Sequence, residues 1–330
     1  MAHLLPPIPW PRLATALLSG GSALLTACHS SPAVEVIAAD GVLCDLTRRL
    51  AAADLRVGCL LAPDDDPHQF LLSPSQSREL RQARLVLING YGLTPALESL
   101  PGTVAVAELA VPHSPATAEP EQHDGHAQDS QHHHDGRDPH VWHDPLQAEA
   151  MLQLVSERLQ RLRPAAAAAI RQREQRMEQS LTALHRWNQR QFATLPPQPG
   201  NRTLATGHRA FSSLARRYGL TELPVVDGDS SSETLRPQAL ASVVHRLKRE
   251  QIPALFSEQW PPSKAMARIS ALSNVPLAPG ALRADGLAGE PRGGLMATLT
   301  SNTCRIVDQL GGSCDRSGQN RLIEGWQAIR

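Results

Sequence analysis

Short apolar runs and longer amphipathic stretches alternate along the chain from about residue 34, and this order predicts an α/β protein. The runs VEVIAA, LRVGCLLAP, RLVLING and GTVAVAEL are expected strands, and stretches with apolar residues at helical spacing lie between them. Strands that alternate with helices favour a parallel sheet with helices on both faces. Ligands of such sheets bind at the loops beyond the carboxyl ends of the strands.

The same alternation resumes in the second half of the chain, after a long helical stretch. Residues 165–195 keep a helical pattern until PPQPGN ends it. Beyond that point RTLATG, LTELPVV, IPALFSE and VPLAPG are expected strands, and GLMATLTSNTCRIVDQLGG is the last long helix that we expect. We therefore predict two lobes, residues 28–164 and 196–330, each a parallel sheet flanked by helices, joined by one long rigid helix.

Residues 112–139 interrupt the first lobe with a polar, histidine-dense segment. It is rich in Pro, His, Asp, Gln and Ser and shows no periodicity. A segment this polar cannot bury enough apolar surface to offset its ordering entropy, so we predict a disordered insertion. Histidine-rich tracts are typical of metal binding, which favours a loop that collects or senses zinc weakly. A solvated linker is the alternative.

The N-terminus has the pattern of an export signal. Arg12 precedes the apolar run LATALLSGGSALLTAC, which is short and ends in small residues. Residues 25–28, Leu-Thr-Ala-Cys, resemble a bacterial lipobox, so we expect residues 1–27 to be a lipoprotein signal peptide and Cys28 to be lipidated. A plain secretory signal is the alternative. In both cases the mature protein is expected outside the cytoplasm, and with a lipid it is anchored to the membrane.

The net charge limits the possible partners, and the remaining cysteines suggest disulfides. The formal net charge is zero with histidines neutral, so nothing favours nucleic acid as a partner. An exported chain permits disulfides. Cys304 and Cys314 are the better pair, because the glycines of LGGSC let the chain turn back after a helix. Cys44 and Cys59 form a second candidate pair, and four buried thiols remain the alternative.

Four residues at expected strand ends or in the turns that follow are candidate metal ligands. A lone histidine in a turn is more often solvated or a helix cap, but two candidates in each half, at equivalent sheet edges, favour one shared site. Three imidazoles and one carboxylate form a common tetrahedral zinc set. The candidates are His68 in PDDDPHQF, His140 in DPHVWHDP, His208 in ATGHRAF and Asp285 in LRADGL.

These stretches resemble the zinc/manganese family of ABC-transporter solute-binding proteins, and its zinc-uptake members most. RDPHVWHDP matches the family's Asp-Pro-His-x-Trp-x-Asp-Pro signature nearly letter for letter, and the similarity extends from about Val34 to the last expected helix. The resemblance implies that a metal lies in the cleft between the lobes. His68 and His140 would come from the first lobe, and His208 and Asp285 from the second. Asp285 matches loosely, so water or a loop histidine could replace it.

The resemblance also implies the function. Manganese members tend to have a carboxylate where this chain has His208, so we expect Zn²⁺ as the transported substrate. The protein would be a periplasmic or extracytoplasmic monomer that is not an enzyme and delivers zinc to an ABC permease and its ATPase. The alternatives are a manganese or iron binder of the same family, a zinc buffer without a permease, and a zinc-dependent hydrolase with Glu258 as its base.

One position departs from the family signature near the site. His143 stands where members usually have an apolar residue. We expect it to be a surface residue, and a spare metal ligand is the alternative.

Overall fold

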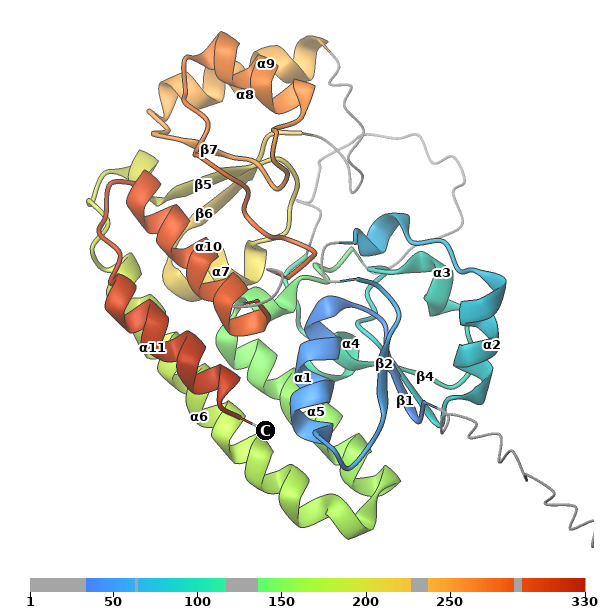
Figure 1. The fold of residues 1–330 in the computed structure, drawn as a ribbon. Coiled ribbons are helices and arrows are strands. Elements are labelled where there is room, and N and C mark those ends of the chain that lie inside the picture. The colour runs from blue at the N-terminus through green and yellow to red at the C-terminus, as the bar shows by residue number, and fades with distance from the viewer. Residues whose placement is uncertain (1–33, 63–64, 117–135, 227–236, 288–292, 330) are drawn as a thin grey trace, which may run out of the picture. The chain divides into compact units, whose positions relative to one another are not determined.

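Parallel strands form two sheets in the computed structural model, which describes residues 34–62, 65–116, 136–226, 237–287 and 293–329 (Figure 1). The strand order is β2-β1-β3-β4 in the first sheet and β6-β5-β7 in the second, with parallel pairing throughout. The predicted α/β fold is confirmed. The strands are β1 (Val36–Ala38), β2 (Val57–Cys59), β3 (Leu85–Ile88), β4 (Thr103–Ala105), β5 (Thr203–Thr206), β6 (Thr221–Pro224) and β7 (Leu255–Phe256).

Helices flank both sheets. Those of the first half are α1 (Gly41–Ala51), α2 (Pro74–Gln82), α3 (Pro95–Glu98), α4 (Val106–Ala110) and α5 (Pro145–Leu162). Those that follow are α6 (Ala167–Phe192), α7 (Ser212–Tyr218), α8 (Pro237–Arg249), α9 (Lys264–Ser273), α10 (Leu295–Gln309) and α11 (Arg316–Gln327). Short 3-10 helices are η1 (Pro67–Gln69), η2 (Val141–His143), η3 (Pro164–Ala166) and η4 (Pro199–Arg202). Within the described ranges, no helix is long and apolar enough to cross a membrane.

The first sheet is buried on both faces, as its continuous apolar strands require. Val36, Ala38 and Leu87 point into a core that they share with α1, α5 and α6. The alternate residues Ile37 and Ile88 point to the opposite face, where a smaller core includes residues of α2 and α3. Side chains of a strand alternate between faces, so each short strand serves both cores.

The C-terminal helices also pack into the core of the first sheet. Leu295 and Trp326 belong to the same buried cluster as Val36. The indole N–H of Trp326 donates to the carboxylate of Asp45 at 2.8 Å, and Arg49 donates to the carbonyl of Trp326 at 2.9 Å. Residues from both ends of the described chain therefore stabilise one core.

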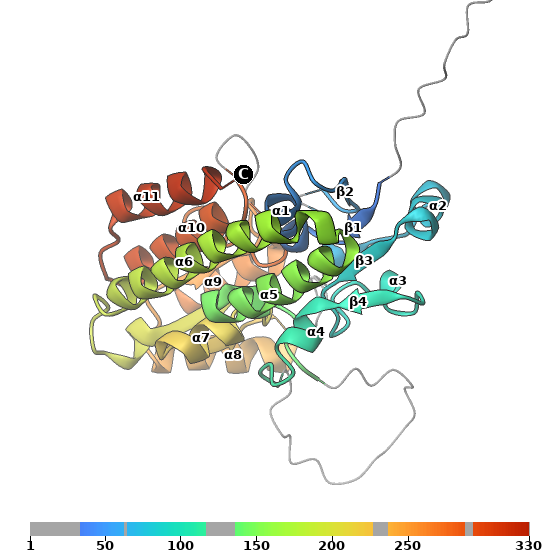
Figure 2. The same cartoon turned by 90° about the horizontal axis from the view of Figure 1, so that it is seen from below.

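The longest helix, α6, contacts helices from both halves of the chain. It packs against α1 and α5 of the first half and against α7, α10 and α11 of the second. Figure 2 shows it running between α5 and the pair α10 and α11. The helix that we expected at residues 165–195 is thus present as Ala167–Phe192. The division into lobes at residues 164 and 195 stays a prediction.

In the sequence DPLQAEAM, Asp144 and Pro145 predict a capped helix start, and α5 begins in this way. The side chain of Asp144 accepts the backbone N–H of Leu146, and Pro145 occupies the first helical position. In SPSQSRELRQA the sequence favours Ser75 as a helix cap, but Ser73 caps α2 instead, through a reciprocal capping box with Gln76. That arrangement satisfies two backbone groups at once.

Two expectations in the second half are wrong. Residues 275–280 form no strand, and only Leu277 makes an isolated parallel bridge with Leu255. Pro276 and Pro279 lack the backbone N–H that a longer ladder needs. In addition, α10 is not the last long helix, because α11 follows it. Few of the residues of α11 are buried, so the apolar signal for this helix is weak.

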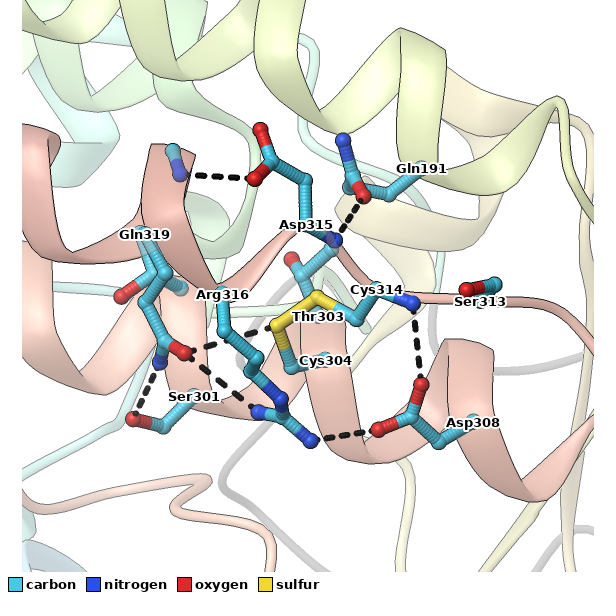
Figure 3. Close-up of a disulfide and its surroundings, with 12 residues drawn as sticks. Gln191, Ser301, Thr303, Cys304, Asp308, Ser313, Cys314, Asp315, Arg316 and Gln319 are labelled. Atoms are coloured by element: carbon cyan, nitrogen blue, oxygen red, sulfur yellow. Dashed lines mark hydrogen bonds and ion pairs between the residues drawn. A yellow bond between two sulfur atoms is a disulfide. The ribbon is translucent and has the colours of Figure 1, made fainter.

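Both candidate disulfides are present, Cys44–Cys59 and Cys304–Cys314. The second joins α10 to the turn before α11 (Figure 3). Around it, Asp308 accepts the backbone N–H of Cys314 at 3.0 Å. Asp315, the cap of α11, donates its own N–H to the side chain of Gln191 on α6 at 2.8 Å. The disulfide therefore fixes the start of α11 against α10, and the hydrogen bond to Gln191 fixes it against α6.

Several predicted features lie outside the described residues. These are the signal peptide at residues 1–27, the lipidation site Cys28, and residues 117–135 of the insertion. The described flanks of the insertion are held together. Ala116 and Arg137 form an antiparallel bridge, and the N–H of Asp138 donates to the carbonyl of Pro115 at 2.8 Å. The insertion therefore leaves and re-enters the fold at one place.

Replacing Cys304 and Cys314 together with serine should lower the free energy of unfolding by about 3 kcal/mol, because their bond closes a loop between residues 10 apart. Guanidinium unfolding followed by circular dichroism measures this loss. The matched pair Cys44 and Cys59, 15 residues apart, should show a loss of similar size. Equal unfolding midpoints for the variant and the oxidised protein would contradict the prediction.

Candidate metal centre

The four candidate ligands come from four separate segments, of which those of His68 and His208 follow strands. His68 lies in η1, beyond β2, and Asp66 caps that turn by accepting the N–H of His68 at 2.9 Å. His140 precedes η2, and His208 follows β5. Asp285 lies in the segment after the isolated bridge at Leu277.

The structure brings all four side chains together. One ligand atom from each lies within 4.8 Å of the others. The Nε2 atoms of His140 and His68 lie 2.7 and 3.2 Å from Oδ1 of Asp285, and 3.4 Å from each other. Nε2 of His208 lies 3.6 Å from Oδ2 of Asp285. A tetrahedral zinc ion places neighbouring ligand atoms about 3.3 Å apart, so this cluster has the right size for one ion.

His140 is the most buried of the three candidate ligand histidines and is held by two carboxylates. Its Nδ1 lies 2.7 Å from Oδ1 of Asp138, which also accepts the backbone N–H of His140 at 2.9 Å. Its Nε2 faces Asp285. Both carboxylates accept, so both ring nitrogens carry protons when no metal is bound. Burial alone would lower the pKa of His140, but Asp285 and Asp138 raise it above its ordinary value.

His208 is oriented by Glu258. One carboxylate oxygen of Glu258 accepts the N–H groups of Gly207 at 2.8 Å and His208 at 3.4 Å, and lies 3.8 Å from Nδ1 of His208. A Cβ at position 207 would overlap Oε2 of Glu258, so a larger residue there would displace this carboxylate. Among the described residues, the buried Nε2 of His208 has no hydrogen-bond partner. Burial lowers the pKa of His208, so this nitrogen keeps a lone pair for a metal.

Asp285 is ionised in this setting. Burial would raise its pKa, but His140, His68 and His208 lower it well below the ordinary value. Glu258 behaves differently, because burial raises its pKa to about 8. The cluster therefore contains one anionic carboxylate and three imidazoles. Glu258 lies outside the cluster and accepts the backbone N–H of His208. Glu258 already accepts hydrogen bonds from two backbone N–H groups. This does not favour Glu258 as the base of a hydrolase.

The expectations for His143 are both wrong. The side chain is buried rather than on the surface, and its Nε2 lies 3.0 Å from the carbonyl oxygen of Ala284 rather than in the ligand cluster. Its ring packs against Phe211, with centroids 4.6 Å apart. Sequence reasoning also missed the role of Asp138, although its position two residues before His140 could have indicated it.

Comparison with known proteins shows the family to which the chain belongs. The family model described as ZnuA, zinc-uptake complex component A, periplasmic, matches residues 36–309. Zinc-binding protein TroA of Treponema pallidum is 27% identical over 288 residues, covering 83% of this chain and 88% of TroA. Manganese-binding lipoprotein MntA of Bacillus subtilis is 25% identical over 251 residues, covering 71% and 76% of the two chains.

Solved structures share the fold. The periplasmic zinc-binding protein TroA of Treponema pallidum superposes with a TM-score of 0.72 at 24% identity, covering 84% of this chain and 99% of TroA. Fe(III)-bound YtgA of Chlamydia trachomatis also has a TM-score of 0.72, at 21% identity, covering 86% and 100%. Members of the matched family are solute-binding proteins rather than enzymes. The chain belongs to the ZnuA family and is a periplasmic, metal-binding substrate-binding protein of an ABC transporter.

Proposed function

We propose that this protein captures Zn²⁺ with His68, His140, His208 and Asp285 and delivers it to the permease of its ABC transporter. The observation that supports this most is the convergence of three imidazoles and one carboxylate within 4.8 Å. Four protein ligands complete a tetrahedral shell and leave no open position for a reacting water. Such a closed site suits capture and release of an ion rather than catalysis.

The ligand types favour zinc over the metals named for some relatives. Imidazole suits zinc, whereas manganese prefers carboxylate, carbonyl and water oxygens. Three of the four ligands here are imidazoles, including His208. Asp285 is the single anionic oxygen, which a tetrahedral zinc ion accommodates. Manganese and iron, named for MntA and for Fe(III)-bound YtgA, are the alternatives, and the titration below distinguishes zinc from manganese.

The origin of the ligands in both halves of the chain supports delivery of the metal to a permease. His68 and His140 belong to the first half of the chain, and His208 and Asp285 to the second, so a bound ion joins the two halves. A ligand shifts a conformational equilibrium only by its differential affinity for the two states. Because α6 packs against both halves, we expect the loaded and empty forms to differ by a small hinge motion. The permease and its ATPase would recognise the loaded form.

Two further parts of the proposal concern residues outside the described ranges. Cys28 would carry the lipid that anchors the periplasmic protein to the membrane. The histidines of the insertion at 112–139 would collect zinc weakly and raise its concentration near the cleft. The insertion leaves the fold beside Asp138, which supports His140. Stimulation of the transporter ATPase by zinc-loaded but not zinc-free protein would separate delivery from simple zinc storage.

Replacing His68, His140 or His208 with alanine should each weaken Zn²⁺ binding by at least about 100-fold, because an incomplete shell remains. Calorimetric titration with Zn²⁺ and Mn²⁺ measures this. A variant that lacks residues 117–135 serves as control, because it keeps the flanking contacts that hold Asp138. His208→Asp should reduce the ratio of zinc affinity to manganese affinity, because it replaces an imidazole with a carboxylate. Tight zinc binding that survives all three alanine changes, or vanishes with the loop, would refute the cleft site.

Asp138→Asn should weaken Zn²⁺ binding about 10- to 100-fold, although Asp138 does not face the ion. A carboxylate on the far nitrogen of a ligating histidine orients the ring and raises its basicity. Asp45→Asn is the matched control, since Asp45 is also hydrogen-bonded but bonds to Arg49 and Trp326 instead. Equal zinc affinities of the two variants, measured by competition with a chelator dye, would contradict this role.

Zinc binding should release about one proton near neutral pH, because His140 must lose the proton on Nε2 to become a ligand. The raised pKa of His140 keeps that proton bound through neutral pH. Apparent affinity should therefore rise up to about tenfold per pH unit from pH 6 to 8. Calorimetry in buffers of different ionisation enthalpy gives the proton count. A pH-independent affinity with no proton release would show that His140 is already neutral.

A further inference from the structure

His143 contacts two of the segments that carry ligands and belongs to a third. It lies three residues after His140, in η2. Its ring packs at a tilt against Phe211, three residues after His208. Its Nε2 meets the carbonyl of Ala284, the residue before Asp285, at 3.0 Å. The side chain of His143 therefore belongs to the segment of one ligand and contacts the segments of two others.

The chemistry of the ring determines what the contact with Ala284 does. A carbonyl oxygen only accepts, so Nε2 of His143 carries the proton and donates. Burial lowers the pKa of His143 to about 4, so the ring is neutral at the pH of zinc binding. Nδ1 is buried and has no hydrogen-bond partner among the described residues. The side chain thus makes one directed hydrogen bond and otherwise packs as a ring.

The Asp285 segment has other anchors, but they come from the second half of the chain. Asn302 of α10 accepts the N–H of Arg283 at 3.0 Å and donates to its carbonyl at 2.8 Å. The N–H of Leu282 donates to the carbonyl of Ser257 at 2.9 Å. Among the described residues, two hydrogen bonds join this segment to the part of the first half that carries His140: His143 to the carbonyl of Ala284 at 3.0 Å, and His140 to the carboxylate of Asp285 at 2.7 Å. Only the bond from His143 uses no atom of the proposed metal ligands, so it can persist when the metal binds.

We propose that His143 is a positioning residue that holds the Asp285 segment in place for the metal before the metal arrives. This inference rests on the proposed function, because it assigns Asp285 as a ligand. An apparent dissociation constant rises as the fraction of binding-competent protein falls. Without the hydrogen bond, the metal-free protein would spend less time with Asp285 beside the three histidines. Zinc association would slow, while dissociation from the assembled site would change little.

Two variants separate the hydrogen bond from ring packing. His143→Phe keeps an aromatic ring against Phe211 but removes the donor. His143→Gln removes the ring but can present an amide N–H near the position of Nε2. His185→Phe is the matched control, since His185 also packs against an aromatic ring and makes a hydrogen bond, but both of these contacts are with Tyr218.

Stopped-flow mixing with Zn²⁺ should show association about 10-fold slower for His143→Phe, with dissociation within about 2-fold of the wild type. His143→Gln should recover association to within about 3-fold, and His185→Phe should match the wild type. Hydrogen exchange of the metal-free proteins should show faster exchange at residues 283–287 in His143→Phe only. An unchanged association rate in folded His143→Phe, or equal slowing in His143→Phe and His143→Gln, would overturn the proposal.

Failure of the proposed function gives a different result. If Asp285 is no ligand, Asp285→Asn binds zinc as the wild type does, and His143→Phe changes hydrogen exchange without changing zinc association. If Asp285 is a ligand, the loss in association caused by His143→Phe should shrink in the Asp285→Asn background, because both changes act through one carboxylate. Additive losses would show that His143 acts elsewhere.

Discussion

The attraction between one partly buried carboxylate and three imidazoles organises the site. An ionised carboxylate away from water is costly unless it is paired. Asp285 meets this requirement in the metal-free protein through His140, which carries the balancing proton. In the proposed function a zinc ion replaces that proton, so the same four side chains suit both states. The site would then exchange one positive partner of Asp285 for another without a large rearrangement.

Each ligand histidine has its position fixed by a carboxylate that lies outside the ligand cluster. Asp66 fixes the turn of His68, Asp138 orients His140, and Glu258 fixes the backbone at His208. All three supports are carboxylates that accept backbone N–H groups, and each is local in sequence or lies at the end of a neighbouring strand. Helix α6 and the C-terminal helices connect the two halves, so the supports share one framework.

Much of this arrangement could be predicted from the sequence because it depends on local patterns. The alternation of strands and helices indicated the fold, and strand ends indicated where His68, His140, His208 and Asp285 would meet. Family resemblance then grouped the four residues into one candidate site. The disulfide pairings followed in part from the glycines next to Cys314.

The features that the sequence did not reveal depend on contacts between distant segments. The burial of His143 depends on Ala284, 141 residues away. Helix α11 is held by the core around Trp326 and Asp45 and by the disulfide, rather than by a strong apolar pattern of its own. The strand expected at residues 275–280 was lost to prolines that prevent ladder pairing. Local propensity cannot report such tertiary constraints.

Crystallography of the zinc-loaded protein, with anomalous data collected on both sides of the zinc absorption edge, tests the central claim most directly. We expect one strong peak bonded to Nε2 of His68, His140 and His208 and to a carboxylate oxygen of Asp285, at about 2.0–2.2 Å from each. A principal peak on the histidines of the insertion, or one that lacks Asp285, would contradict the account.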